Sequence, residues 1–182
     1  MQRRDFLRTT GLVASGGALA GCPGRNRETG LLVARLSDQS GVIGDFESCV
    51  VTIRELRVLS AADATETEDH EGAELLFSVD EVSVDLVEIA GEGSAFALEQ
   101  ELMPGAYVYL KLVVANVDAT LTDGREAVVE TPDNGPLKFP VPFEIRSGQG
   151  TTLTADVAPV QRGAPTSYLL RPMPLNTTVS YD

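Results

Sequence analysis

The fold of this chain is decided by residues 106–122, which read AYVYLKLVVANVDATLT. β-Branched and aromatic side chains occupy most positions from Tyr107 to Val114, and such residues favour strands because they pack well on a pleated surface. Lys111 is the only charged residue among these eight. We therefore expect this stretch to be the central strand of a sheet, with Tyr107 and Tyr109 on one face covering the core.

Turn residues follow this strand. Asp123-Gly124 stands before a second apolar run, Ala127–Val129, and Asp-Gly between two strand patterns favours a β-hairpin because both residue types tolerate positive φ. Residues 137–145 carry Pro140 and Pro142, which lack the amide hydrogen that an interior strand donates. We expect this segment to lie at a sheet edge.

A second long strand pattern runs from Phe46 to Leu59. Every second residue from Cys49 to Ile53 is apolar, and the alternation resumes at Leu56 with its parity shifted by one position. One extra residue in a strand produces such a shift, so the pattern predicts a β-bulge near Arg54-Glu55. Cys49 lies inside the pattern, and we expect it to pack as a small buried hydrophobe; a free reactive thiol or an intermolecular bridge is the alternative.

Shorter strand patterns recur along the chain, and turn residues separate them at intervals of roughly 8–12 residues. They lie at residues 31–36, 82–86, 151–157, 167–173 and 175–181. No long segment shows the apolar period of an amphipathic helix. The pattern predicts an all-β fold, an antiparallel β-sandwich with immunoglobulin-like or transthyretin-like Greek-key topology, formed by residues 30–182 as a single domain.

The N-terminal residues resemble an export signal. Arg3 and Arg4 precede Asp5-Phe6-Leu7, and residues 11–20 form a small, uncharged, apolar run that is too short to span a bilayer. A pair of arginines in this place resembles a twin-arginine signal, which a receptor reads and which exports proteins already folded. We expect residues 1–21 to be removed as a signal peptide.

Leu19-Ala20-Gly21-Cys22 resembles a lipoprotein box, in which the chain is cut before the cysteine and its sulfur carries lipid. The reaction needs an exposed nucleophilic thiol. Because one acyl chain binds membranes only marginally, a dialkyl lipid is expected. Residues 22–29 would then be a lipidated tether that holds the domain on the extracellular side of the cell membrane. The alternative is an ordinary cleaved signal with an incidental cysteine.

The charge of the chain is strongly acidic. Lysine and arginine number 14 against 27 aspartates and glutamates, a net charge of −13, and the only lysines are Lys111 and Lys138. Such a surface suits high salt, where screening limits repulsion between charges to about 3 Å at 1 M. We expect a halophilic source of haloarchaeal type; a merely acidic secreted protein is the alternative. Nucleic acid is excluded as a partner, since no basic stripe exists to neutralise phosphates.

Two positions are candidates for binding or modification in the mature chain. Asp38 and Asp45 flank one loop, and hard oxygen ligands at that spacing could hold Ca²⁺; a capped turn on a solvated edge is the alternative. Asn176-Thr177-Thr178 matches the N-glycosylation acceptor pattern, which would place Asn176 at the surface.

Catalytic residues cannot be assembled from the sequence. His70, the only histidine, lies in an acidic, threonine-rich stretch typical of an exposed loop. The sequence contains no zinc-ligand spacing and no glycine-rich phosphate loop, and one loop histidine does not make a Ser-His-Asp or Cys-His system. We expect no catalytic residue and no cofactor other than calcium.

A series of turn and strand motifs covers nearly all of the mature chain: Leu102–Tyr107, Leu110–Leu112, Leu121–Gly124, Gly30–Asp38, Asp45–Ser48, Val51–Ile53, Leu137-Lys138, Pro142-Phe143, Thr151–Asp156 and Tyr168–Pro172. The order of these motifs resembles the domain-of-unknown-function family numbered 4382. The resemblance implies a secreted or lipid-anchored β-sandwich of archaea and bacteria, and it implies no known catalytic residues.

These observations favour a non-enzymatic surface lipoprotein, a structural, adhesion or interaction module outside the membrane. The alternative is a binding module for an extracellular polysaccharide or a small solute, which a concave pocket with converging polar groups would favour. An exported hydrolase would instead need a buried pair of carboxylates, one with a raised pKa. The sequence does not name a protein or polysaccharide partner.

Overall fold

The computed structural model describes residues 28–38, 41–64, 73–90 and 93–182. Strands dominate these residues, so the all-β prediction is confirmed. The strands are β1 (Gly30–Ser37), β2 (Phe46–Ser60), β3 (Leu75–Asp85), β4 (Ala95–Leu102), β5 (Gly105–Leu121), β6 (Glu126–Glu130), β7 (Leu137–Phe139), β8 (Phe143–Ile145), β9 (Gly150–Gln161), β10 (Ser167–Pro172) and β11 (Thr178–Tyr181). The short helical turns are η1 (Gly41–Asp45), α1 (Leu86–Ile89) and η3 (Pro132–Asn134).

β5 is the central strand that residues 106–122 predict. Along one edge it pairs with β2 over almost its whole length, and along the other it pairs in turn with β8, β7 and β6. Tyr107 and Tyr109 are each only 3 % exposed. Tyr107 belongs to the hydrophobic core as expected, whereas Tyr109 lies outside it, beside Lys111 and Lys138. The Tyr107 ring stacks on Phe143 of β8 with a centroid separation of 5.2 Å, which fastens β8 to the central strand.

The two local irregularities predicted from the sequence are confirmed. Against β5, the register of β2 shifts between Ile53 and Glu55 because Arg54 is the extra residue of a bulge. The register against β3 shifts at the same place, but there the extra residues lie on β3, between Ser78 and Val82. The hairpin between β5 and β6 turns at Asp123-Gly124, where Gly124 has φ +81° and Leu121 donates its amide to the Arg125 carbonyl at 2.8 Å. Positive φ at this position explains the preference for glycine.

The predicted edge segment splits into β7 and β8, each three residues long. Pro140 and Pro142 lie between them, outside both strands. Each strand pairs with β5 alone among the described strands. This arrangement agrees with the expectation for proline, because neither proline occupies a position that must donate to a ladder.

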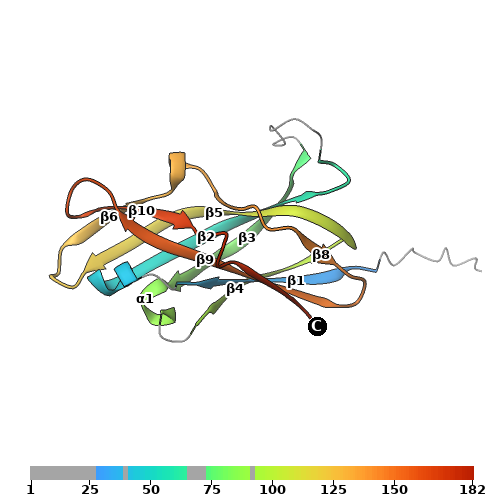
Figure 1. The fold of residues 1–182 in the computed structure, drawn as a ribbon, viewed down its shortest axis with the longest axis horizontal. Coiled ribbons are helices and arrows are strands. Elements are labelled where there is room, and N and C mark those ends of the chain that lie inside the picture. The colour runs from blue at the N-terminus through green and yellow to red at the C-terminus, as the bar shows by residue number, and fades with distance from the viewer. Residues whose placement is uncertain (1–27, 39–40, 65–72, 91–92) are drawn as a thin grey trace, which may run out of the picture.

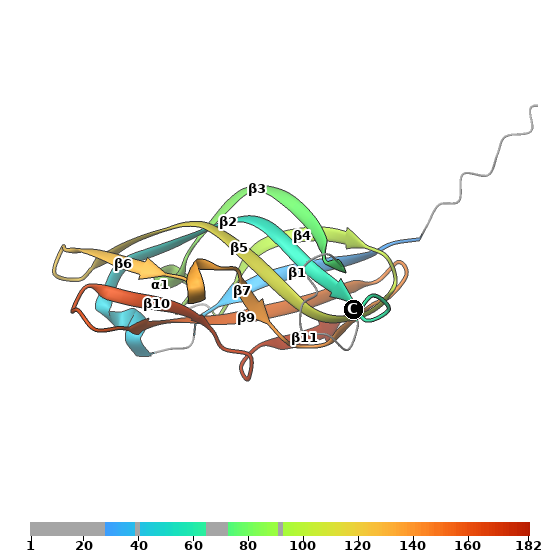
Figure 2. The ribbon, with the colours of Figure 1, turned by 90° about the horizontal axis from the view of Figure 1, so that it is seen from above.

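The described strands form one mixed sheet in the order β3-β2-β5-β6-β10-β9-β1-β4, with β11 beside β9 (Figure 1). Two of its pairs, β1 with β9 and β6 with β10, are parallel. The end strands β3 and β4 contact each other, so the sheet is nearly closed into a barrel (Figure 2). The expected sandwich of two antiparallel sheets is therefore not confirmed. Closure shortens the exposed edges at which sheets from different molecules would pair.

The hydrophobic core fills the interior of this curled sheet, and every long strand contributes to it. Fully buried members with 2 % exposure or less include Leu32, Leu36, Ile53, Leu56, Leu86, Leu110, Leu112, Leu137, Phe139, Ile145 and Leu153. β1 begins at Gly30, where an added Cβ would lie 2.2 Å from the Arg146 carbonyl oxygen. Only glycine leaves room for β1 to start this close to the β8–β9 turn.

Candidate functional site

Several predicted sites lie outside the described residues: Arg3, Arg4, the lipidation site Cys22 and the loop histidine His70. Export, lipidation and the solvation of His70 therefore stay predictions. Among the residues that the structure describes, no helix has the length and apolar character needed to cross a bilayer.

The two aspartates of the predicted calcium site lie in different surroundings. Asp38 is only 1 % exposed, at the end of β1. Asp45 is exposed at the end of η1 and lines a surface hollow together with Asp123, Arg125 and Tyr168. Within the four described segments, no group of three or more possible metal-ligating side chains is found. Calcium binding therefore stays a prediction.

Asn176, the predicted glycosylation site, is exposed, but its side chain is hydrogen-bonded. Its Nδ2 donates to Asp156 Oδ2 at 2.9 Å. Because an amide nitrogen that carries a sugar keeps one hydrogen, this bond and glycosylation are compatible. Glycosylation of Asn176 stays a prediction.

Asp156 is a buried carboxylate that fastens the C-terminal segment to β1 and β9. It is 1 % exposed and accepts a second hydrogen bond, at 2.9 Å, from the Ser37 hydroxyl. The Thr177 hydroxyl accepts from the Asp156 amide at 3.3 Å and donates to the Met173 carbonyl at 3.2 Å. These bonds satisfy both carboxylate oxygens, which a buried carboxylate requires, and we assign the group a structural role.

Cys49 is buried, as predicted. Removal from water, with the nearby charges of Asp85 and Asp38 adding to the effect, raises the pKa of its thiol to about 12. The thiolate is the nucleophilic form of cysteine, so at neutral pH this side chain is an inert part of the core.

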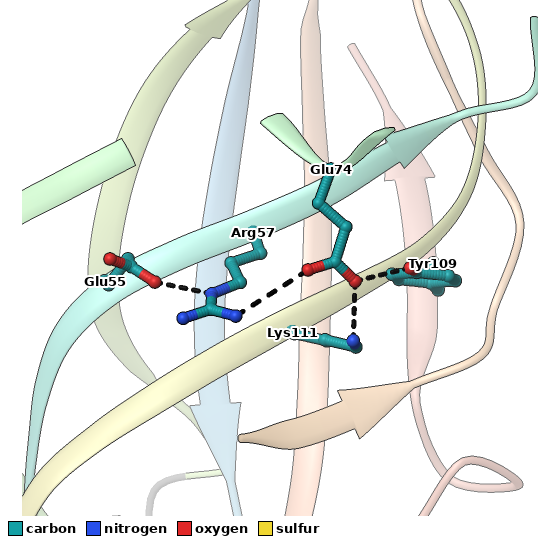
Figure 3. Close-up of polar contacts among 5 residues, drawn as sticks. All are labelled: Glu55, Arg57, Glu74, Tyr109 and Lys111. Carbon is teal, nitrogen blue, oxygen red and sulfur yellow. Dashed lines mark hydrogen bonds and ion pairs between the residues drawn. The ribbon is translucent and has the colours of Figure 1, made fainter. Parts of the chain in front are cut away.

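A polar cluster surrounds Glu74, which directly precedes β3 (Figure 3). The side chain of Glu74 is fully buried. Its Oε1 accepts a hydrogen bond from the Tyr109 hydroxyl at 2.5 Å and forms an ion pair with Lys111 Nζ, also at 2.5 Å. Its Oε2 lies 3.8 Å from Arg57 Nη1, and the Arg57 Nε pairs with Glu55 at 2.5 Å. Two strands, β2 and β5, thus place cations and a phenol around one buried carboxylate.

Both lysines of the chain lie at this cluster. Lys111 on β5 is directly opposite Lys138 on β7 in the strand register. The Lys138 ammonium lies 4.3 Å from the centre of the Tyr109 ring, and the Lys111 ammonium lies 5.2 Å from it. Cations at these distances are attracted to the electron-rich face of a phenol ring. Tyr109 therefore holds both ammonium groups on one side of β5.

An open groove of about 340 Å³ lies beside the two lysines. We call it the lysine groove, and it is lined by Lys111, Lys138, Asp133, Gly135 and the prolines at 132, 136 and 172. Asp133 and Asn134 have left-handed backbones, with φ of 52° and 53°, and fold η3 into a tight turn closed by a 2.8 Å hydrogen bond from the Gly135 amide to the Pro132 carbonyl. Aspartate and asparagine tolerate this conformation better than most residues.

Sequence reasoning did not identify this cluster. It noted Lys111 and Lys138 only as the sole lysines, and it did not consider Glu74 or Arg57. The scarcity of lysine could nevertheless have pointed to the site. When an acidic chain has only two lysines and both fall in strand patterns, each is a candidate for a functional residue. Their juxtaposition could not be inferred, because it depends on the pairing of β5 with β7.

The arrangement is suited to binding an anion. Within the cluster, Arg57 and Lys111 are paired with Glu55 and Glu74. Lys138 makes no ion pair with any carboxylate of the described residues, and it is exposed at the groove. An ammonium group with no carboxylate partner offers up to three hydrogens to a ligand oxygen.

Comparison with known proteins assigns a family but no activity. A search of the curated proteins finds no match. The family described as "Domain of unknown function (DUF4382)" matches residues 29–172, from just before β1 to the end of β10. Since this match spans well over half of the sequence, the chain belongs to the DUF4382 family.

Proposed function

We propose that this chain is a non-enzymatic lipoprotein that serves as an interaction module on the outer face of the cell membrane. The order of the twin-arginine pair, the lipoprotein box and the short tether supports export and anchoring. The observation that carries the interaction role is the lysine groove, where the Lys138 ammonium makes no ion pair with any described carboxylate although the chain as a whole is acidic. The proposed role includes a structural or adhesive function, in which the module contacts a partner without binding a small ligand.

The tether would keep the domain close to the membrane. Gly30 lies eight positions after Cys22, and a fully extended chain of that length spans at most about 29 Å. Gly30 pairs with Leu102, and Leu31 pairs with Gly150, so the β4–β5 and β8–β9 turns would face the membrane with the start of β1 (Figure 1). The turns at Asp123-Gly124 and at residues 162–166 would point outward.

The second candidate function is a binding module for an extracellular polysaccharide or a small solute. The lysine groove favours it, because its volume of about 340 Å³ is within the range of ligand sites and cationic, acidic and apolar side chains converge there. This candidate differs from the first in requiring a defined ligand, which a binding measurement can identify.

Replacing Cys22 by serine is expected to move the mature protein almost entirely from the membrane fraction to the soluble fraction. The serine hydroxyl cannot receive the lipid in the thioether linkage, and without two hydrocarbon chains the polar tether has no stable membrane affinity. Fractionation of cells followed by detection of the protein measures the change. Cys49→Ala is the matched control, because it removes the other cysteine and should leave the protein in the membrane. An unchanged distribution of the Cys22 variant contradicts the anchor.

The domain is expected to lose most of its stability when salt is removed. The full chain has a net charge of −13, so its carboxylates repel one another, and lowering the salt from 1 M to 0.1 M extends this repulsion from about 3 Å to about 10 Å. The midpoint of urea unfolding, followed by circular dichroism, should rise steeply with potassium chloride. Equal midpoints in dilute buffer and in molar salt would overturn the halophilic assignment.

A further inference from the structure

We propose that the lysine groove binds an acidic sugar, such as a uronic-acid residue of an extracellular polysaccharide, with Lys138 contacting the carboxylate. This inference rests on the interaction role proposed above and names the ligand class of the same site.

The charges of the cluster leave Lys138 for a ligand. Glu74 is fully buried and already receives Lys111 and Tyr109, while Arg57 lies between Glu55 and Glu74. The Tyr109 ring holds the Lys138 ammonium from one side, at 4.3 Å, without neutralising it. An anion that enters the groove therefore meets a positioned positive charge, and a charge-assisted hydrogen bond between an ammonium and a carboxylate is among the stronger single contacts.

The groove is larger than a simple inorganic anion requires. About 340 Å³ can take a ring with substituents, and three prolines present rigid apolar surface to it. A sugar ring has apolar C–H faces and hydroxyl edges, so it can lie against proline while its hydroxyls remain hydrogen-bonded. Proline side chains lose little conformational entropy when a ligand binds, because the proline ring is already nearly rigid.

Asp133 distinguishes an acidic sugar from a multiply charged anion. Asp133 lines the same groove as Lys138. A carboxylate accepts hydrogen bonds from hydroxyl groups but repels phosphate or sulfate oxygens. A ligand that carries one carboxylate and several hydroxyls satisfies both side chains, whereas a compact dianion satisfies only the lysine.

The experiment is a calorimetric titration of the full chain, purified in detergent and held in molar salt so that repulsion by the acidic surface is screened. The probes are short oligogalacturonate, the same oligomer with its carboxylates methyl-esterified, and inorganic phosphate. We expect oligogalacturonate to bind, the methyl ester to bind at least about tenfold more weakly, and phosphate not to bind, because the ester removes the charge that Lys138 contacts.

Three variants separate the contact from general charge and folding effects. Lys138→Gln should weaken oligogalacturonate binding at least about tenfold, and Lys138→Arg should retain most of it. Arg54→Gln removes the same charge from an exposed position in the β2 bulge and should leave affinity unchanged. Thermal unfolding of each variant verifies that it is folded; the exposed Lys138 contributes only about 1 kcal/mol through its contact with the tyrosine ring.

The outcomes test separately the acidic-sugar ligand and the interaction role of the groove. Oligogalacturonate binding that Lys138→Gln does not weaken places the sugar elsewhere and overturns the inference. If phosphate binds in a way that depends on Lys138 and oligogalacturonate does not bind, the ligand is not an acidic sugar. The groove would then still be an anion-binding site, and the proposed interaction role would stand. If none of the probes binds, the acidic-sugar inference is wrong, and the lysine groove no longer supports the proposed interaction role.

Discussion

Replacing Glu74 by leucine is expected to lower the free energy of unfolding by about 3–5 kcal/mol. The Glu74 side chain is fully buried and the Lys111 side chain is only 13 % exposed, so the variant leaves a largely buried ammonium without its anion. The Tyr109 hydroxyl also loses its acceptor. Urea unfolding in molar salt measures the loss.

A second substitution tests whether the penalty comes from the unpaired lysine. Combining Glu74→Leu with Lys111→Met should restore most of the lost stability, since apolar residues of similar size often replace a buried ion pair without net cost. Glu55→Gln is the matched control: this carboxylate is more accessible, with its side chain 22 % exposed, and its removal should cost about 1 kcal/mol or less. A Glu74 variant as stable as the parent protein would contradict a buried ion pair.

Phe139→Ala is expected to lower the free energy of unfolding by a similar amount, about 3–5 kcal/mol, because it leaves a cavity that the surrounding side chains cannot fill. Phe139 is 0 % exposed and is the last residue of β7, next to Lys138. Alternation along β7 buries Phe139 in the core and exposes Lys138 at the groove. The variant should therefore weaken the edge of the sheet that carries the lysine groove.

Phe96 supplies the matched control for this cavity. It lies on the end strand β4 and is 47 % exposed, so Phe96→Ala removes the same atoms with much less loss of burial. We expect an effect of about 1 kcal/mol or less on the same unfolding measurement. Equal losses for the two variants would show that β7 is not part of the core.

Local features of the fold were predictable because they depend on residues close together in the sequence. The apolar run of β5, the Asp-Gly turn after it and the parity shift at Arg54 each follow from backbone and side-chain preferences over a few positions. The two tyrosines were expected to cover the core, and both are buried, but only Tyr107 belongs to the hydrophobic core. Tyr109 is buried in the polar cluster around Glu74 instead. The one-turn helix α1 was not predicted; it begins after Asp85, whose side chain accepts from the Val87 amide at 2.9 Å, and a single turn is too short to show a period.

The candidate site was only partly predictable. The sequence pointed to Asp38, Asp45 and Asn176 through local patterns, and the structure describes one of these aspartates as buried and the other as exposed. Glu74 gave no local indication, since an isolated glutamate before a strand resembles many surface residues of an acidic chain. Its burial depends on Lys111 and Tyr109, which lie 35 or more positions away.

The sequence by itself determined the strands, their turns and the acidic character of this protein, because alternation, turn chemistry and charge are read within short windows. The tertiary structure alone decided that β1 and β9, more than 100 positions apart, pair in parallel, and that one mixed sheet curls until β3 meets β4. It also decided that the only two lysines stand opposite each other beside a buried carboxylate. Strand pairing is set by the burial and hydrogen bonding of the whole chain at once, which no local pattern contains.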